Sequence, residues 1–120
     1  MERNWDTIRE ILIAAESLEP DTTLGLSDFP EDRAHEISYH AELLEEAGLV
    51  HASIYKTLGL GPTQFHLYRL TWSGHELLDA IRNESIWRKT KSTITSKGGS
   101  MTFELIKSVA IELAKTAMGL

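Results

Sequence analysis

The stretch from Ile37 to Val50, ISYHAELLEEAGLV, decides the fold of this chain. Its apolar residues recur at helical spacing and predict one buried stripe on an amphipathic helix, at Ile37, Ala41, Leu44 and Ala47. Gly48 stands where helices commonly end in a left-handed residue, a conformation that glycine adopts at low cost. A β-rich run follows at once, so the stretch predicts a helix that turns directly into a strand.

The residues before this stretch predict one long helix and a short connection. The first helix should span about residues 4–18, because Pro20 disfavours helix in the residue before it. Residues 22–26 are expected to form a short strand. The second helix should begin near Asp28 or Pro30, with Asp28 and Glu31 as a capping box, and continue to Ala47. A standard helix-turn-helix has a further helix here, and the space allows either a turn around 29–33 or a merged helix.

The residues after this stretch predict a hairpin and further helices. Alternating apolar residues indicate half-buried strands at 49–58 and 64–70, joined by a turn rich in glycine and proline. The next helix should span about 72–83 behind a Thr71 or Ser73 cap, and 84–96 either continues it or forms a separate helix. Gly98-Gly99 ends this region, and Ser100 or Thr102 caps a last helix to about residue 118.

This order predicts a mainly α (α+β) fold, a winged helix-turn-helix with a two-stranded β-hairpin wing and extra C-terminal helices. Residues 1–84 would form the winged-helix domain, and residues 85–120 a C-terminal helical extension packed on it, in a single compact domain. The commonest work of this fold is binding duplex DNA.

Charge is distributed unevenly along the 120 residues, which carry a formal net charge of −6. Residues 1–50 hold three basic and thirteen acidic groups, whereas residues 51–120 hold nine basic and five acidic groups. The chain has no cysteine, no apolar run of membrane-spanning length and a charged beginning unlike a signal peptide. We therefore expect a cytoplasmic protein with no membrane association and no cofactor.

Two binding functions remain open. The first is a small DNA-binding transcriptional regulator of double-stranded DNA, with candidate contacts at Arg33, Ser38, Tyr39, Lys56, Arg69, Arg88, Lys89 and Lys91. The outer face of the second helix argues against DNA binding, because it contains no lysine or arginine that could neutralise phosphate. This face consists of Glu31, His35, Ser38, Tyr39, Glu42, Glu45 and Glu46. The alternative is a non-enzymatic protein-interaction module that binds a protein partner, for example a phage protein binding a host protein. Its interaction face would be His35, Glu42, Glu45 and Glu46.

The last helix carries a heptad-like apolar seam. A possible homodimer would form through the seam residues Phe103, Ile106, Ala110, Leu113 and Ala117. The alternative is a helix wrapped by its own domain. We expect no enzymatic activity, because the sequence shows no set of acid, base and nucleophile at a spacing typical of a catalytic site. We expect no metal site, because His75 and Asp79 lack the second histidine of a zinc-protease motif.

The sequence also resembles the small winged-helix "domain of unknown function" proteins common in phages, prophages and bacteria. The segments that carry the resemblance are residues 1–12, residues 37–50, RLTWSGHELLDAIRNESIW at 69–87 and KGGSMTFELIK at 97–107. The resemblance implies a winged-helix fold with added C-terminal helices and a bacterial or phage-related origin. It implies no activity and no functional residue.

Overall fold

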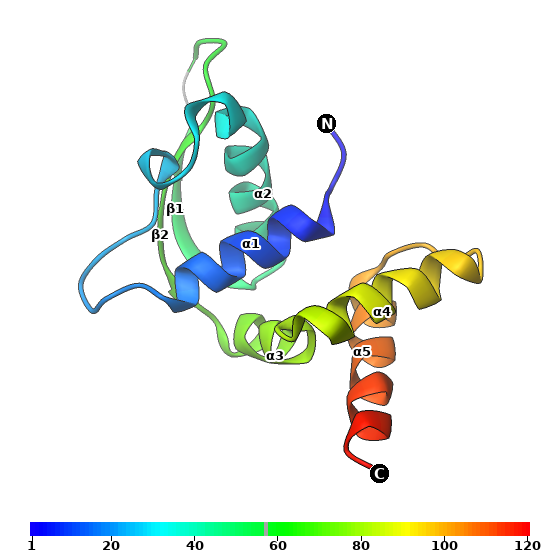
Figure 1. The fold of residues 1–120 in the computed structure, drawn as a ribbon. Helices are drawn as coiled ribbons and strands as arrows, with labels where there is room; N and C mark the ends of the chain where they lie inside the picture. The colour runs from blue at the N-terminus through cyan, green and yellow to red at the C-terminus, as the bar shows by residue number, and fades with distance from the viewer. Residues whose placement is uncertain (57) are drawn as a thin grey trace. The chain divides into compact units, whose positions relative to one another are not determined.

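The computed structural model describes residues 1–56 and 58–120 (Figure 1). In these residues the chain is mainly helical, with five α-helices and a two-stranded antiparallel sheet, so the predicted α+β class is confirmed. The chain divides into two compact units, Met1–His75 and Glu76–Leu120. The first contains the stretch that decides the fold.

The first unit begins with α1 (Trp5–Glu16), within the predicted range. Asn4 is its N-cap, because its side-chain oxygen accepts hydrogen bonds from the backbone N–H groups of Asp6 and Thr7, at 2.9 and 3.3 Å. One face of the helix is buried, at Trp5, Ile8, Ile11, Leu12 and Ala15. This apolar stripe anchors the helix in the unit.

The connection to the second helix consists of two short 3-10 turns, η1 (Leu26–Asp28) and η2 (Glu31–Arg33). The predicted turn is therefore correct, and the merged helix is wrong. The predicted capping box of Asp28 with Glu31 is also wrong. The Asp28 carboxylate instead accepts the backbone N–H of Gly25 at 2.8 Å, which closes the turn before it.

The second helix, α2 (Ala34–Glu46), buries the predicted stripe, since Ile37, Ala41 and Leu44 are at most 1% exposed. Ala47 was predicted in the stripe but is exposed, because it caps the helix and lies beyond its last turn. Gly48 has a φ of 72°, the predicted left-handed end.

The hairpin consists of β1 (Val50–Tyr55) and β2 (Gln64–Leu70), paired antiparallel. The predicted strand 49–58 is shorter than expected, and its residue 57 lies outside the described residues. A β-bulge follows from the register, because His51 pairs with Arg69 whereas Ala52 pairs with Leu67. Tyr68 is the extra residue, so Tyr68 and Arg69 are both exposed and Leu70 returns to the core.

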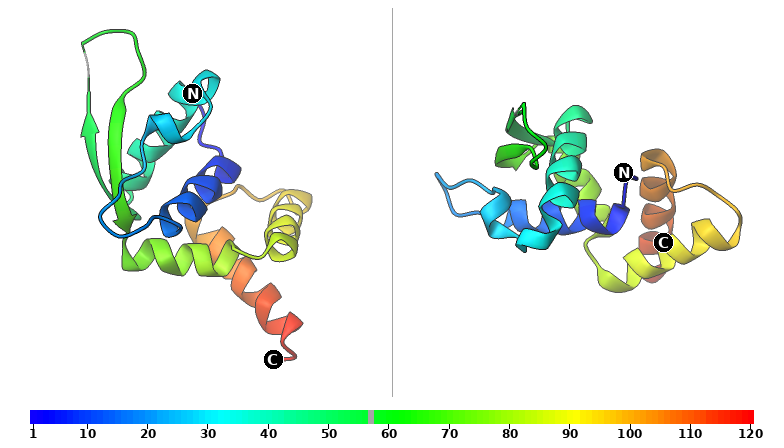
Figure 2. Two further views of the ribbon diagram at one scale, coloured as in Figure 1. Left: turned by 60° about the vertical axis from the view of Figure 1, so that its left-hand side comes forward. Right: turned by 90° about the horizontal axis from the view of Figure 1, so that it is seen from above.

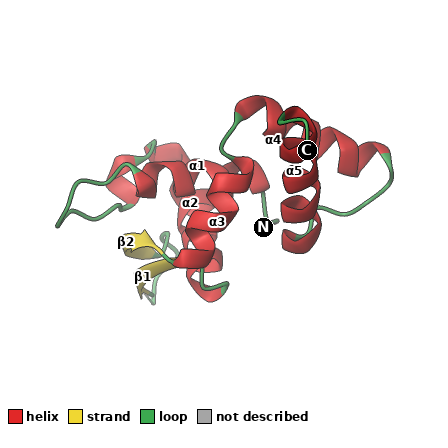
Figure 3. Cartoon of the chain, turned by 90° about the horizontal axis from the view of Figure 1, so that it is seen from below, coloured by secondary structure: helices red, strands yellow, loops and turns green. Residues whose placement is uncertain are grey.

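The predicted strand at 22–26 is reduced to one bridge. Leu24 and Leu67 exchange two backbone hydrogen bonds of 2.9 Å, which adds a single antiparallel pair to β2. Both α1 and α2 contact the hairpin, as Figure 2 and Figure 3 show for the first unit. The core of this unit thus lies between two helices and one face of the hairpin.

The third helix, α3 (Trp72–Ile81), begins behind the predicted Thr71 cap. The Thr71 hydroxyl accepts the N–H of Gly74 at 3.1 Å and donates to the carbonyl of Gly48 at 2.7 Å. This one side chain therefore fixes the start of α3 beside the end of α2.

The second unit is mainly formed by α4 (Glu84–Ser96) and α5 (Phe103–Ala117). The side chain of Asn83 accepts the N–H of Ile86 at 2.9 Å, so α4 is a separate helix rather than a continuation of α3. Thr102 is the cap of α5, with its hydroxyl accepting the N–H of Leu105 at 3.2 Å. The two helices pack against each other and bury Trp87, Thr90 and Ile94 of α4 with Ile106 and Ala110 of α5.

Candidate functional site

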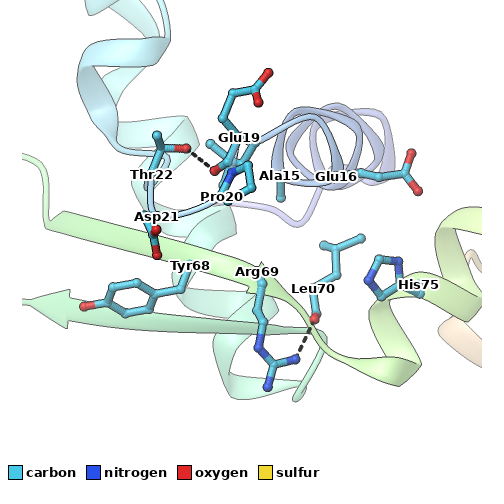
Figure 4. A pocket seen from close by; sticks show the side chains of 11 residues that line it. Ala15, Glu16, Glu19, Pro20, Asp21, Thr22, Tyr68, Arg69, Leu70 and His75 are labelled. Atoms are coloured by element: carbon cyan, nitrogen blue, oxygen red, sulfur yellow. Dashed lines mark hydrogen bonds between the residues drawn. The ribbon is translucent and has the colours of Figure 1, made fainter.

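Three of the surface hollows that the described residues form lie in the first unit. The one in Figure 4 has a volume of about 270 Å³ and lies between the end of α1 and β2. Its polar side chains do not converge, because Glu16 and Glu19 point in different directions and the Arg69 guanidinium donates to the carbonyl of Leu70 at 3.2 Å. Among the described residues no three His, Cys, Asp or Glu side chains lie close enough to hold a metal ion.

The other two hollows adjoin each other between α2 and the residues that lead into β2. One, of about 200 Å³, is lined by Met1, His35, Ser38, Tyr39, Glu42 and Gly61–Thr63. The other, of about 400 Å³, shares Pro62 with the first and is lined in addition by Leu26, Ser27, Phe29, Glu31, Ala34 and Gln64. We call them together the α2–hairpin groove, and it lies beside the predicted acidic face.

The acidic face of α2 consists of His35, Glu42, Glu45 and Glu46. His35, Glu45 and Glu46 are exposed, and Glu42 is half-buried beside the groove. Ser38 was predicted on this face, but it is 5% exposed and its hydroxyl donates to the carbonyl of His35 at 3.2 Å. The helix lies between α1 and the hairpin, so its buried stripe is wider than an apolar pattern alone indicates. Tyr39 is half-buried beside His40, with its ring edge-on at 5.4 Å.

Arg33 is held by two carboxylates of its own unit. Its guanidinium donates to both oxygens of Glu10, at 2.9 and 2.8 Å, and to both oxygens of Glu36, at 3.1 and 2.9 Å. The hydrogen bonds to Glu10 and Glu36 raise the pKa of Arg33 above its ordinary value. This predicted DNA contact is therefore already engaged by two internal anions.

Glu36 is the centre of this network. Hydrogen bonds from Arg33 and from the Thr7 hydroxyl, which donates at 2.6 Å, lower the pKa of Glu36 from 4.5 to about 2. The i,i+3 spacing of Arg33 and Glu36 is visible in the sequence, whereas Glu10 lies 23 residues away from Arg33. Only the packing of α1 on α2 joins the three side chains.

His40 is a buried polar residue that sequence reasoning did not identify as structural. It is 1% exposed, its Nε2 accepts the backbone N–H of Asn4 at 2.8 Å, and its Nδ1 lies 2.7 Å from the carbonyl oxygen of Glu36. Because one ring nitrogen accepts, the other must donate, and the imidazole is neutral with its proton on Nδ1. No local sequence signal links residues 36 positions apart.

The hairpin supplies two of the predicted DNA contacts. The Lys56 ammonium lies 3.3 Å from a carboxylate oxygen of Glu42, so the acidic face of α2 partly neutralises it. Arg69 is exposed and is turned back toward the carbonyl of Leu70. Each of these two cations therefore has an interaction partner within its own unit.

The remaining predicted DNA contacts are on α4. Arg88 and Lys89 are exposed, and in the described part of the chain neither forms an ion pair. The Lys91 ammonium lies 5.3 Å from the centre of the Trp87 ring, in a cation–π contact. The second unit thus displays cations without carboxylates on the same stretch of helix, from Ser85 to Lys97.

The other predicted groups have separate structural roles. Asp79 pairs with Arg82 at 2.7 Å, so it has a partner other than the i,i+4 histidine His75. In the predicted dimer seam, Ile106 and Ala110 are fully buried and Phe103 and Leu113 are half-buried, whereas Ala117 is exposed. The first half of the seam therefore contributes to the core of its own unit. Homodimerisation stays a prediction, and Leu105 and Ile111 are apolar residues of α5 that remain exposed.

Comparison with known proteins gives a family. Residues 2–100 match the model of a family described as "Hypothetical protein (DUF2513)". The chain belongs to this family. It is 43% identical over 117 residues to an uncharacterized protein of Haemophilus influenzae, covering 92% of each chain. The predicted resemblance to a family of unknown function is thus confirmed.

No solved structure matches the chain significantly. No helix among the described residues has the length and hydropathy of a bilayer-spanning segment.

Proposed function

We propose that the first unit is a winged-helix module that binds a protein partner through the acidic face of α2. The winged-helix assignment is supported by the order α1, the Leu24 bridge, the two 3-10 turns, α2 and the β1–β2 hairpin. Relative to a standard winged helix, the Leu24 bridge stands in place of the first strand. The two 3-10 turns stand in place of the helix before the recognition helix, and α2 stands in place of the recognition helix itself. The proposed role is non-enzymatic.

One observation carries the proposal: the helix in the recognition position presents carboxylates, and nearby cations are neutralised. Glu45 and Glu46 are exposed, Glu42 engages Lys56, and Glu36 with Glu10 engages Arg33. Residues 1–75 carry five basic and thirteen acidic groups, a net charge of −8. DNA phosphates would be repelled by such a surface, whereas a basic protein surface would be attracted and oriented by it.

The test is charge reversal on the acidic face. The double variant Glu45→Lys with Glu46→Lys should lose the partner captured by chemical crosslinking in the cells that natively encode the chain. The control, Glu19→Lys with Glu104→Lys, changes net charge equally at exposed positions elsewhere and should keep the partner. Capture of the same partner by both double variants would contradict the proposal.

A second candidate, DNA binding through α4, is favoured by the exposed Arg88 and Lys89. Fluorescence anisotropy with fragments of the source genome, repeated across salt concentrations, tests it directly. A DNA-binding protein would bind tightly at low salt and lose affinity steeply with salt, and Arg88→Glu with Lys89→Glu would reduce that slope. Absence of binding at low salt would exclude this candidate.

A further inference from the structure

We propose that the α2–hairpin groove binds an extended segment of the partner that places an arginine or lysine at Glu42 and an apolar side chain beside Pro62. This inference rests on the proposed protein-binding function and specifies the chemistry of its partner. The two hollows of the groove, of about 200 and 400 Å³, share Pro62 and therefore adjoin. Each has a different lining.

The smaller hollow has the chemistry of a cation site. Glu42 contributes an oxygen, Oε1, that is enclosed by the protein and makes no hydrogen bond among the described residues. The Lys56 ammonium lies 3.3 Å from this oxygen, within ion-pair distance but without hydrogen-bond geometry, and its side chain is 76% exposed. The Glu42 side chain as a whole is 30% exposed. An incoming guanidinium or ammonium would therefore reach the exposed part of this carboxylate from the hollow and share its charge with Lys56.

Tyr39 adds to this preference, because its ring lines the same hollow. Aromatic faces attract cations, and arginine most often. The described residues that line this hollow also include His35, an exposed residue at the edge of the acidic face, and the N-terminal residue Met1. The smaller hollow therefore combines a carboxylate acceptor with an aromatic ring.

The larger hollow suits an apolar side chain. Leu26, Phe29, Ala34 and Pro62 line it together with the polar Ser27 and Gln64, and Glu31 is charged among these described residues. Phe29 and Leu26 are half-buried, so part of their apolar surface remains in contact with water. Covering that surface would stabilise a complex in proportion to the area removed from water.

The occupant is a protein segment rather than nucleic acid, because the groove carries a carboxylate in each hollow, Glu31 and Glu42. Phosphate groups would be repelled by both. In an extended segment, alternate side chains point to the same side and lie about 6–7 Å apart. A cation and an apolar residue two positions apart would therefore reach adjoining hollows.

The experiment titrates the isotope-labelled full chain with capped peptides and follows backbone NMR shifts. The probe peptide has arginine and leucine two positions apart, and its controls replace arginine by neutral citrulline or leucine by serine. We expect shifts at Ala34, His35, Thr63 and Gln64, with affinity lowered about fivefold by either control. No shifts at millimolar peptide, or equal binding of the citrulline peptide, would overturn the inference.

Matched variants of the chain locate the site. Glu42→Gln should weaken the probe peptide about fivefold, whereas Glu19→Gln, at an exposed position of the same unit away from the groove, should not. Ala34→Leu should fill the larger hollow and block the leucine, whereas Ala47→Leu at the exposed helix end should not. Equal effects within either pair would overturn the assignment of the groove.

The two proposals fail separately. Loss of the crosslinked partner in Glu45→Lys with Glu46→Lys, without any peptide binding, would overturn the groove and leave the acidic face as the interaction surface. Peptide binding to the groove, without loss of the partner, would support the cation and apolar chemistry while contradicting the proposed role of the outer carboxylates.

Discussion

The backbone N–H of Asn4 donates to Nε2 of His40 at 2.8 Å, which ties the start of α1 to the middle of α2. Asn4 is also the N-cap of α1, so one residue both begins the helix and fixes its position. The other ring nitrogen of His40 donates to the carbonyl of Glu36, 2.7 Å away. The contact between α1 and α2 at this point is therefore made by a buried imidazole through hydrogen bonds.

Replacing His40 should destabilise the protein markedly. His40→Ala leaves the Asn4 N–H without its acceptor and opens a cavity, so we expect a loss of about 2–4 kcal/mol in the free energy of unfolding. His35→Ala, at an exposed position of the same helix, should cost less than about 0.5 kcal/mol. Urea denaturation measures both. NMR of the ring nitrogens should find the proton on Nδ1, and a proton on Nε2 would contradict the assignment.

Glu36 should make stability depend on pH in the acid range. Its pKa is lowered in the folded state, first by the hydrogen bond from Arg33 and then by that from Thr7, from 4.5 to about 2. A lowered carboxyl pKa stabilises the folded state above pH 4.5, and this contribution is lost as pH falls toward 2. The stability difference between the wild type and Glu36→Gln should therefore shrink over this interval.

The order of the two causes supplies a control. Thr7→Val removes the hydroxyl donor but keeps the guanidinium, so it should flatten the pH dependence less than Arg33→Met does. Thermal or urea unfolding at several values between pH 2 and pH 6 measures how stability depends on pH in the wild type and in the three variants. An equal slope in the wild type and Glu36→Gln would show that the carboxylate does not contribute.

The sequence was sufficient to predict most of the helices and the hairpin, because these elements have local signals. The stripe from Ile37 to Leu44, the left-handed Gly48 and the alternating β2 residues all depend on neighbours within a few positions. The bulge at Tyr68 has no such signal, since it follows from how β2 pairs with β1. The predicted alternation therefore holds up to Leu67 and shifts by one residue after it.

The candidate site was less predictable for the same reason. The acidic face is visible as a run of glutamates, but the burial of Ser38 depends on α1 and the hairpin enclosing two sides of α2. Pairing of Lys56 with Glu42 and of Arg33 with Glu10 requires the fold. These contacts bear on the functional expectation, because they pair two of the predicted DNA contacts with carboxylates of their own unit.

Gly74 should not tolerate a side chain, although it lies in a helix where alanine is ordinarily favoured. A Cβ at this position would collide with the backbone carbonyl oxygen of Leu49. Alanine gains about 1 kcal/mol over glycine in an exposed helix, but a collision with backbone cannot be relieved by rotating a side chain. We therefore expect Gly74→Ala to destabilise by about 2 kcal/mol or more.

Ser73→Ala is the matched control for this collision, since Ser73 is exposed in the same helical turn. It should change the free energy of unfolding by less than about 0.5 kcal/mol in urea denaturation. A Gly74→Ala variant as stable as the wild type would mean that α3 does not approach Leu49 this closely.

Replacing Asp21 by glycine should not lower the free energy of unfolding. Asp21 has a φ of 64°, and the backbone N–H of Thr22 donates to the carbonyl of Glu19 at 3.2 Å. Pro20 occupies the second position of this four-residue turn, so the turn matches type II, whose third position requires a positive φ. Asp21→Gly should therefore leave stability unchanged or raise it by up to about 1 kcal/mol.

Asp21→Val should lower stability by about 1–2 kcal/mol, because a β-branched residue is strained at positive φ. Urea denaturation of the two variants decides the point, since a valine variant as stable as the glycine variant would exclude the left-handed turn.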